Sequence, residues 1–320
     1  MSKNIVILDG KSLGDVQYEK LEKYGKLTCY ETTQYEDVSS RIKDAHIVFT
    51  NKVVLDRKNL AEAKNLEIIC EIATGFNNID IEYAKERGIA VTNVAGYSTS
   101  AVVQHTFATA FALMDEVLYY DNYVKSGNYS KCGFFTCLDK PFNEIEGKTW
   151  GIIGLGNIGK RVAKIAEAFG ANVIYYSTSG KNSCDMYRRV SFDELLENSD
   201  IISIHAPLNE KTNKLINYDA LCKMKKSALL INMGRGPIVS EVDLARALNE
   251  ERIKGAALDV FEVEPVKADT PILTVKDKEK LILSPHIAWA SVEARARLFD
   301  EVIKNIDAFY NNEERNRVDN

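Results

Sequence analysis

The 320-residue sequence lacks the features that would assign it to several specialised classes of protein. Its six cysteines include no Cys-x-x-Cys pair and have no neighbouring histidine, so the spacing of a zinc site is missing and we expect reduced thiols and no metal. No apolar stretch approaches the roughly 20 residues that a membrane-spanning helix needs. Six prolines and eighteen glycines are too few for a disordered or collagen-like chain, so the sequence predicts a folded globular protein.

An excess of basic charge is also missing. The 41 Lys and Arg residues face 46 Asp and Glu residues, for a formal net charge of -5 at pH 7, which disfavours nucleic acids and membranes as partners. The apolar run over residues 5–8 is too short for a secretory signal, so we expect a cytoplasmic location. At about 150 residues per domain, the length predicts roughly two domains.

Short apolar runs alternate with helical stretches in two series along the chain. This alternation predicts an α/β fold built on doubly wound, mostly parallel sheets. The second series contains six runs, which fits one sheet with crossover helices. The predicted strands cover residues 5–8, 47–50, 68–70 and 90–92 in the first series, and 150–153, 173–176, 201–204, 228–231, 256–258 and 281–283 in the second.

Two long stretches stand apart from this alternation. Residues 98–125 contain no glycine or proline and are apolar at several helical positions, which predicts one long helix buried between layers, domains or subunits. The next residues, 126–146, are irregular and rich in aromatic side chains, and loops of that length usually serve a function or a contact. We therefore predict a homodimer formed through residues 98–146. A last helix, at about 291–310, could return to pack on the first domain.

A glycine-rich segment after the strand at 150–153 has the pattern of a dinucleotide-binding loop. In that pattern Gly154 permits a tight turn, Gly156 lets a pyrophosphate approach the backbone, and Gly159 lets the following helix pack closely on the strand. The first amides of that helix would then face the phosphates. Because the glycines lie between a strand and a helix, with another strand following, the segment predicts binding of NAD or NADP rather than a merely structural turn.

The residues after the next strand bear on the choice between NAD and NADP. An acidic residue here would bind the ribose hydroxyls, but the sequence has Ser177, Thr178, Ser179 and Lys181. Without a carboxylate nothing repels a 2′-phosphate, and the hydroxyls and Lys181 could donate to it, although the stretch lacks an Arg, the usual phosphate clamp. This pattern favours NADP. The alternative is a polar loop that binds NAD through Ser177.

Three predicted strand ends in the second series each carry a charged or titratable residue. Arg235 follows the strand at 228–231, Asp259 and Glu264 follow the strand at 256–258, and His286 follows the last one. Because the carboxyl ends of parallel strands line the ligand crevice, these side chains should converge beside the nucleotide. Taken one at a time, each has an ordinary explanation as a surface charge or a structural residue.

Together these residues fit hydride transfer to a 2-oxo acid. Arg235 would bind the substrate carboxylate through two hydrogen bonds and help to polarise the carbonyl. His286 would donate a proton to the alkoxide that forms as hydride arrives, and would take it back during oxidation. Glu264 would fix the orientation of His286 and raise its pKa by charge attraction.

Four motifs together make the sequence resemble a known family. They comprise the glycine-rich segment and the three catalytic stretches, at residues 147–159, 232–236, 259–265 and 284–286. In this order they are similar to those of the D-isomer-specific 2-hydroxyacid dehydrogenases, and the resemblance covers nearly the whole chain. The branch that looks most similar is that of glycerate dehydrogenase, or hydroxypyruvate reductase, on residues 96–99, 104–106, 285–289 and 293–295.

The resemblance implies two Rossmann-like domains, with a cofactor domain inserted within a substrate domain. Residues 1–97 and 290–320 would form the flavodoxin-like substrate domain, and residues 98–289 the dinucleotide-binding domain. It also implies the catalytic set of Arg235, Glu264 and His286. The implied cofactor contacts beyond Gly154, Gly156 and Gly159 are Asn157, Ile158, Ser177, Ala206, Pro207, Thr212, Met233, Gly234 and Asp259, the last near the carboxamide.

The implied substrate site draws on both domains. Backbone N–H groups at Thr74 and Gly75 would meet the substrate carboxylate across the cleft, together with Arg235 and His286. Trp289 would either wall the pocket against a side chain or only pack. The sequence does not separate glyoxylate, hydroxypyruvate, pyruvate and a bulkier aromatic 2-oxo acid as substrates.

The leading interpretation is a dehydrogenase that interconverts a short 2-oxo acid and its D-2-hydroxy acid. One alternative is a nucleotide-sensing regulatory protein on the same scaffold, which the intact catalytic set disfavours. Another is oxidation of formate or phosphite, which would need different residues in the substrate domain. The remaining histidines are interpreted as structural, with His205 at a strand end and His105 and His46 in packing positions.

Overall fold

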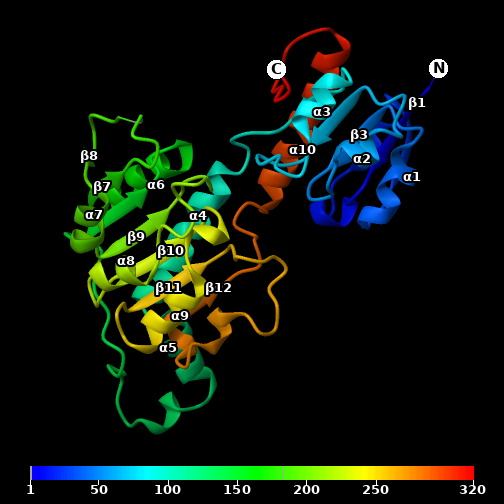
Figure 1. Ribbon diagram of the computed structural model, residues 1–320. Coiled ribbons are helices and arrows are strands. Elements are labelled where there is room, and N and C mark those ends of the chain that lie inside the picture. Colours follow the sequence, from blue (N-terminus) through cyan, green and yellow to red (C-terminus); the bar gives the residue numbers. More distant parts are fainter. Residues whose placement is uncertain (1, 182) are drawn as a thin grey trace. The chain divides into compact units, whose positions relative to one another are not determined.

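The computed structural model describes residues 2–181 and 183–320, and the chain divides into two compact units (Figure 1). The first unit comprises Met1–Ser98 and Ala290–Asn320, the blue to cyan and the red parts of the chain. The second unit comprises Thr99–Trp289. The middle of the sequence therefore folds as one unit, and both ends of the chain belong to the other.

The first unit is built on a five-stranded parallel sheet in the order β2-β1-β3-β4-β5. Helix α10 contacts β4, and the side-chain amide of Asn305 on α10 donates to the carbonyl of Asn93 at 3.0 Å. The strands are β1 (Lys3–Ile7), β2 (Gly25–Cys29), β3 (Ile47–Thr50), β4 (Ile68–Glu71) and β5 (Ala90–Thr92). The helices are η1 (Gly10–Leu13), η2 (Tyr18–Leu21), η3 (Tyr35–Asp37), α1 (Val38–Ile42), α2 (Arg57–Leu60), α3 (Ile81–Glu86) and α10 (Val292–Tyr310).

The second unit contains a seven-stranded parallel sheet in the order β12-β11-β10-β9-β6-β7-β8. The strands are β6 (Thr149–Ile153), β7 (Asn172–Tyr176), β8 (Arg188–Arg189), β9 (Ile201–Ile204), β10 (Leu229–Asn232), β11 (Gly255–Leu258) and β12 (Leu281–Leu283). The helices are α4 (Thr99–Met114), α5 (Val117–Lys125), η4 (Tyr129–Lys131), α6 (Asn157–Ala168), α7 (Phe192–Asn198), α8 (Tyr218–Lys223), η5 (Gly236–Ile238), α9 (Glu241–Asn249), η6 (Pro271–Thr274) and η7 (Lys278–Lys280). The predicted α/β class with parallel sheets is confirmed.

Successive side chains on the strands of the second unit enter separate cores, as the two-residue period of a strand requires. Ile152 packs with α4 and α6 on one face, while Ile153 packs with α7, α8 and α9 on the other. On the α4 face, Trp150 is fully buried, with its ring centroid 4.9 Å from that of Phe107. Both faces are covered, which explains why the strand sequences are continuous apolar runs rather than alternating ones.

The strands that the sequence did not predict both lie at sheet edges. Strand β2 has two residues that are half-buried and three that are exposed, and β8 contains only the exposed pair Arg188 and Arg189. An edge strand needs no continuous apolar run, because water can satisfy its outer side. These two strands therefore carry little hydrophobic signal in the sequence.

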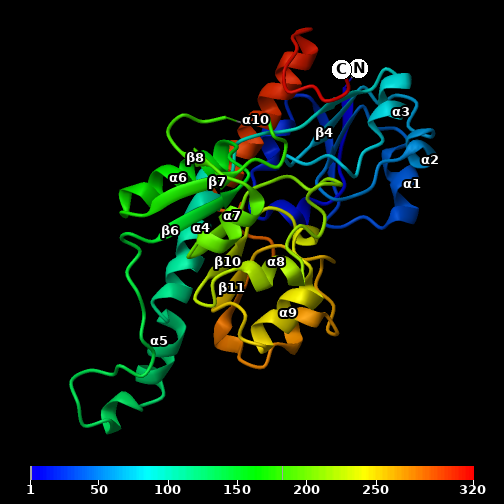
Figure 2. The same cartoon turned by 60° about the vertical axis from the view of Figure 1, so that its left-hand side comes forward.

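The prediction of one long buried helix over residues 98–125 was wrong. The chain breaks at Glu116, which adopts a left-handed backbone conformation with φ 53° and pairs with Lys254 at 3.1 Å. The second helix, α5, has no buried residue. Figures 1 and 2 show α5 and the segment after it projecting from the body of the second unit. Over the described residues, no helix combines the length and apolarity needed to span a membrane.

Candidate active site

The carboxyl edge of the seven-stranded sheet collects the predicted residues of the second unit. The strand order places the ends of β7, β6 and β9 beside those of β10, β11 and β12. Ser177, Gly154, Ala206, Gly234, Asp259 and His286 follow these strands in that spatial order. Ligands of open parallel sheets bind at this edge. The glycine-rich loop and the residues predicted to be catalytic are thus brought to one edge of one sheet.

The glycine-rich loop connects β6 to α6 through a turn that demands glycine. Gly154 has φ +93°, and a Cβ there would lie 2.8 Å from the backbone of Ala206. Gly156 precedes the helix without any neighbour within 4 Å of where its Cβ would be, and no side chain caps the helix that begins at Asn157. The first backbone amides of α6 are therefore open to an anion, as a pyrophosphate site requires.

The hydroxyl of Ser177 supports a ligand beyond the end of β7. Ser177 is 4% exposed, and its Oγ has no hydrogen-bond partner among the described residues. A buried hydroxyl without a partner costs about 1 to 3 kcal/mol, which a ligand that bonds to it would recover. The residues of this edge therefore fit an adenine dinucleotide, with open helix amides for the pyrophosphate and an unsatisfied hydroxyl near the ribose position.

Arg189 is a residue that the sequence analysis missed. It lies on β8, paired with Tyr175 of β7, and its Nη1 donates to the carbonyl of Gly180 at 3.0 Å. This places a guanidinium on the loop after β7, where the sequence stretch itself contains no Arg. Arg188 and Arg189 follow this loop in the sequence, where nothing marks them as its neighbours. Only the parallel pairing of β8 with β7 brings Arg189 to the loop.

Two other predicted cofactor residues, Thr212 and Met233, are buried and make contacts within the protein. Thr212 is fully buried, and its hydroxyl donates to the carbonyl of Pro207 at 2.7 Å and accepts from the amide of Asn209 at 2.8 Å. Met233 is 7% exposed and packs into the core beneath α4. Asn157 is exposed and Ile158 is half-buried at the start of α6. Thr212 therefore braces the loop at Pro207, and the open positions lie at the helix start.

Arg235 is exposed on a turn that the side chain of Asn232 holds from below. Asn232 is fully buried, accepts from the amide of Gly234 at 3.0 Å and donates to the carbonyl of Arg235 at 3.0 Å. A Cβ at Gly236 would lie 1.8 Å from the carbonyl oxygen of Phe261, so glycine is required where the turn meets the next loop. Nη1 of Arg235 donates to the carbonyl of Gly234 at 2.9 Å, but among the described residues Arg235 forms no ion pair, so its charge is not balanced by a carboxylate of the protein.

His286 and Glu264 form a pair. Nδ1 of His286 lies 2.7 Å from Oε2 of Glu264, and Oε1 of Glu264 accepts from the amide of Phe261 at 3.0 Å. Because a carboxylate only accepts, Nδ1 carries the hydrogen of this bond and Nε2 is the ring atom left to exchange a proton with a substrate. Gly236 and Glu264 both meet the backbone at Phe261, so the loops that carry Arg235 and Glu264 are packed together.

Asp259 holds the turn on which His286 sits. It is 1% exposed, and its Oδ1 accepts from Ser284 Oγ at 2.6 Å and the amide of Ile287 at 2.8 Å. Its Oδ2 accepts from the amide of Ala288 at 2.9 Å. His286 itself has φ 55°, and its amide donates to the carbonyl of Asp259 at 2.8 Å. The carboxylate predicted to contact the cofactor is thus engaged mainly with the His286 turn.

His205 directly follows β9. Its Nε2 lies 3.0 Å from Ser203 Oγ, which also accepts from the indole N–H of Trp150 at 2.8 Å. Burial lowers the pKa of His205 to about 3. The ring is therefore neutral at ordinary pH, and it forms no ion pair in the described part of the chain.

The residues predicted to bind the substrate carboxylate outside this edge lie in the first unit. Thr74 and Gly75 follow β4, and the hydroxyl of Thr74 donates to the carbonyl of Val94 at 2.9 Å. Trp289, the last residue of the second unit, is half-buried against the core of α4 and α6. No group of His, Cys, Asp or Glu in the described residues could hold a metal ion.

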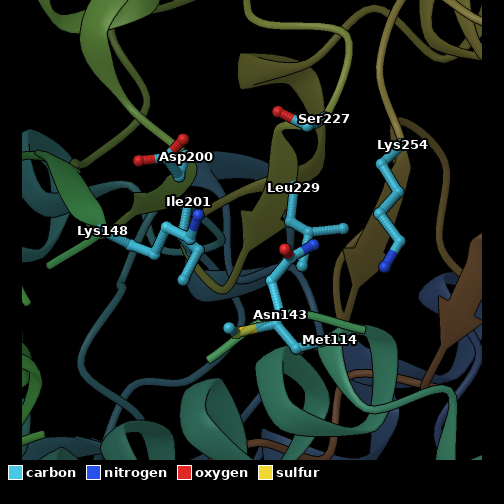
Figure 3. A pocket seen from close by; sticks show the side chains of 8 residues that line it. All are labelled: Met114, Asn143, Lys148, Asp200, Ile201, Ser227, Leu229 and Lys254. Atoms are coloured by element: carbon cyan, nitrogen blue, oxygen red, sulfur yellow. The ribbon is translucent and has the colours of Figure 1, made fainter. Parts of the chain in front are cut away.

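The cavity shown in Figure 3 is not part of this edge. Lys148, Ile201 and Leu229 lie at or just before the amino ends of β6, β9 and β10, at the opposite edge of the sheet. Its complete lining is Met114, Asn143, Lys148, Asp200, Ile201, Ser227, Leu229 and Lys254. The amide of Thr149 donates to Asp200 at 2.9 Å and Lys225 pairs with it at 2.9 Å, so this carboxylate is bound within the protein.

Comparisons with known proteins agree with this site. Residues 107–288 match the family described as D-isomer specific 2-hydroxyacid dehydrogenase, NAD binding domain. The chain is 38% identical to hydroxypyruvate reductase of Blautia hydrogenotrophica over 95% of this chain and 96% of that one. It is 37% identical to glycerate dehydrogenase of Methylorubrum extorquens over the full length of both.

A solved structure with a similar fold is the NADPH-dependent glyoxylate/hydroxypyruvate reductase of Sinorhizobium meliloti, in complex with NADP and malonate. It superposes with a TM-score of 0.84 at 26% identity, covering 99% of this chain and 97% of that one. The chain described here belongs to the D-isomer specific 2-hydroxyacid dehydrogenase family. It lies in the glycerate dehydrogenase and hydroxypyruvate reductase branch, and it is an oxidoreductase of 2-oxo acids that uses NAD or NADP. The regulatory alternative is not favoured.

Proposed function

We propose that this chain reduces a short 2-oxo acid of the glyoxylate or hydroxypyruvate type to its D-2-hydroxy acid, with Arg235, Glu264 and His286 as the catalytic residues. The observation that carries this proposal is the 2.7 Å contact between His286 and Glu264 on a loop packed against the loop of Arg235. The names of the relatives support the choice of substrate, because hydroxypyruvate and glyoxylate reductases recur among them.

Each residue then has one task. Arg235, exposed and without an ion pair in the described residues, binds the substrate carboxylate through its two terminal nitrogens. When bound, the nicotinamide supplies the hydride. Nε2 of His286 donates a proton to the oxygen of the substrate carbonyl, and Glu264 stabilises the ring and fixes its direction through Nδ1. In the reverse direction Nε2 accepts the proton.

The first unit supplies two of the proposed substrate residues, Thr74 and Gly75. Thr74 and Gly75 follow β4, at the carboxyl edge of the first sheet, where ligands of such sheets bind. That their backbone amides bind the substrate carboxylate stays a prediction. Trp289 packs against the core, which supports a structural role, and its part in walling the substrate pocket stays a prediction.

For the cofactor we favour NADPH. Residues 177–181, which directly follow β7, include no acidic side chain, and Asp185 comes only later in the loop. The hydroxyl of Ser177 has no partner among the described residues, and Arg189 from β8 donates to the carbonyl of Gly180. A guanidinium and a hydroxyl are suited to a phosphate on the ribose, whereas NADH offers only hydroxyls there. The pyrophosphate would meet the amides at Asn157 and Ile158, where α6 begins.

Binding constants test this preference without relying on turnover. We expect the protein to bind NADPH at least about 10-fold more tightly than NADH, the size of one charge-assisted contact. Arg189→Gln should weaken NADPH binding and leave NADH binding unchanged, with the exposed Arg188→Gln on the same strand as the matched control. Equal affinities for the two nucleotides in the unaltered protein would contradict the preference.

A homodimer through residues 98–146 is part of the proposal. The segment after α5 exposes several large apolar side chains, which a partner subunit would cover. These side chains are Phe134 at 76%, Phe135 at 90%, Leu138 at 80% and Phe142 at 56% exposure. Sedimentation equilibrium should give twice the 35.9 kDa chain mass, and Phe134→Ser with Phe135→Ser should shift it toward the monomer. The cytoplasmic location stays a prediction from the sequence.

A rate panel tests the function itself. NADH and NADPH oxidation are measured with glyoxylate, hydroxypyruvate, pyruvate and phenylpyruvate, and the fastest rates are expected with the first two. Absence of turnover with all four acids, by protein that binds the nucleotide, would overturn the proposal. Faster turnover of phenylpyruvate than of hydroxypyruvate would overturn the assignment to short substrates.

A further inference from the structure

His105 lies far from the catalytic residues in the sequence, but it is joined to their loop by a chain of hydrogen bonds. It is carried by α4, which packs against β10, β11 and β12. Its Nε2 lies 2.9 Å from the hydroxyl of Ser284, which directly follows β12. Ser284 in turn contacts Asp259 at 2.6 Å. His105 therefore has a polar contact, with Ser284, in addition to the packing role predicted for it.

The hydrogens in this chain can be assigned from the chemistry of its members. The carboxylate of Asp259 only accepts, so the single hydroxyl hydrogen of Ser284 points to Oδ1 of Asp259. Ser284 then has only lone pairs for His105, and Nε2 of His105 must carry the hydrogen between them. The order of donation is His105 to Ser284 to Asp259.

The end of this chain is the turn that carries His286. Asp259 also accepts from the amides of Ile287 and Ala288, at 2.8 and 2.9 Å. Because His286 has a left-handed backbone with φ 55°, its turn is not one that the residue adopts by default. A carboxylate held in place by Ser284 would fix those two amides, and with them the direction in which the imidazole points.

We propose that His105 and Ser284 are positioning residues for the reaction, which act through Asp259 to hold His286 in its reactive orientation. The proposal rests on the proposed role of His286 as the proton donor. Neither residue touches the substrate in this account, so their loss should lower kcat and leave substrate and nucleotide binding nearly unchanged. Misplacement of a catalytic group by about 1 Å is enough to cost about 100-fold in rate.

The test is a double-mutant cycle, which compares the unaltered protein with two single variants and with the double variant. Ser284→Ala removes both hydrogen bonds of the hydroxyl, and His105→Phe keeps a ring but removes the donor. We expect each variant to lower kcat by about 10-fold or more for the 2-oxo acid that turns over fastest. The loss in the double variant should fall well short of the product of the single losses, because without the Ser284 hydroxyl His105 faces Asp259 only at 3.8 Å, beyond hydrogen-bond distance.

Conservative variants and a matched control keep the test informative if a variant is poorly folded. Ser284→Thr retains the hydroxyl, and His105→Gln places an amide donor near the position of Nε2, so both should recover most of the lost kcat. Thr106→Val is the control, because Thr106 is fully buried beside His105 on α4 but donates only within the helix, to Val102 at 2.8 Å. This control should keep kcat within about 2-fold.

An isotope effect separates positioning from a general loss of stability. With nicotinamide deuterated at the transferred position, Ser284→Ala should show a larger primary isotope effect than the unaltered protein, because the chemical step becomes slower. Wild-type kcat in Ser284→Ala, or a double variant whose loss equals the product of the single losses, would overturn the proposal. Full activity of His286→Ala would instead overturn the proposed function, so the two failures are distinguishable.

Discussion

The two sheets of this protein each carry a buried carboxyl group at their carboxyl edge, and the two groups are treated in opposite ways. In the second unit, Asp259 accepts three hydrogen bonds, from Ser284, Ile287 and Ala288. In the first unit, Glu71 is fully buried at the end of β4, and Asn78 donates to it at 3.1 Å. The other oxygen of Glu71 has no partner in the part of the chain that the structure describes.

The electrostatic consequence follows from that difference. Burial raises the pKa of Glu71 to about 9, so the group is neutral at pH 7, and the nearby Asp9 raises it further while Lys52 and Asn78 oppose the shift. Asp9 also has a raised pKa because of burial, although the amides of Asn51 and Lys52 donate to it. Burial alone therefore does not determine what a buried carboxyl group does. Such a group fixes the backbone around it where a neighbouring turn donates hydrogen bonds to it.

The largest effect should come from removing the organising carboxylate. Asp259→Ala leaves two buried amides and a hydroxyl without an acceptor and frees the His286 turn. We expect kcat to fall by about 100-fold or more, as for a misplaced catalytic group. Steady-state kinetics would check this, with nucleotide affinity measured in parallel. Activity near that of the unaltered protein would show that Asp259 is not needed to hold the His286 turn.

A smaller effect, in stability rather than rate, is expected at the other carboxyl group. A folded pKa raised from 4.5 to about 9 means that the folded state keeps a proton that the unfolded state releases between those pH values. The free energy of unfolding of the unaltered protein therefore falls as pH rises through this window. Glu71→Gln removes that titration, so the variant should be more stable at pH 9 by a few kcal/mol, because a one-unit change in pKa is worth about 1.4 kcal/mol.

The measurement is chemical denaturation of both proteins at pH 5 and at pH 9. At pH 5 the two free energies of unfolding should nearly coincide, because Gln resembles the protonated acid. The titration of Asp9 is present in both proteins and contributes a slope of the same sign to each. A variant that is less stable than the unaltered protein at pH 9 would show that Glu71 is ionised and held by interactions.

The smallest effect should come from removing a donor of Glu71. The amide of Asn78 donates to Glu71 and to the carbonyl of Val53, both at 3.1 Å. Asn78→Ala should destabilise the fold by about 1 kcal/mol, the net worth of an ordinary hydrogen bond. Its loss should also raise the pKa of Glu71 further, so the variant should lose stability over a wider pH range. Thermal unfolding as a function of pH would detect both changes.

The parts of the fold that the sequence predicted are those with local signals. The buried strands at residues 150–153, 201–204 and 228–231 are continuous apolar runs, and the glycines of the nucleotide loop have a fixed spacing. The edge strands β2 and β8 and the break at Glu116 have no such signal. A left-handed glutamate in an otherwise helical stretch depends on a contact with Lys254, which is far along the chain.

The residues proposed for the site divide in the same way between local and long-range signals. Arg235, Glu264 and His286 could be named because each follows a strand in a recognisable motif. The support beneath them could not, because Asp259 and Ser284 are 25 residues apart and His105 and Ser284 are 179 apart. Arg189 was missed because only the pairing of β8 with β7 brings it to the ribose loop. Long-range hydrogen bonds between polar residues leave no periodic pattern in a sequence.

The central claim is that His286, oriented by Glu264, transfers the proton during reduction of a 2-oxo acid. The most direct test is a single-turnover measurement of NADPH oxidation by His286→Ala, with hydroxypyruvate as substrate and nucleotide affinity determined separately. The account predicts a rate lower by about 100- to 10,000-fold, the usual contribution of a general acid, with NADPH affinity unchanged. A variant that binds NADPH normally and oxidises it at the rate of the unaltered protein would contradict the account.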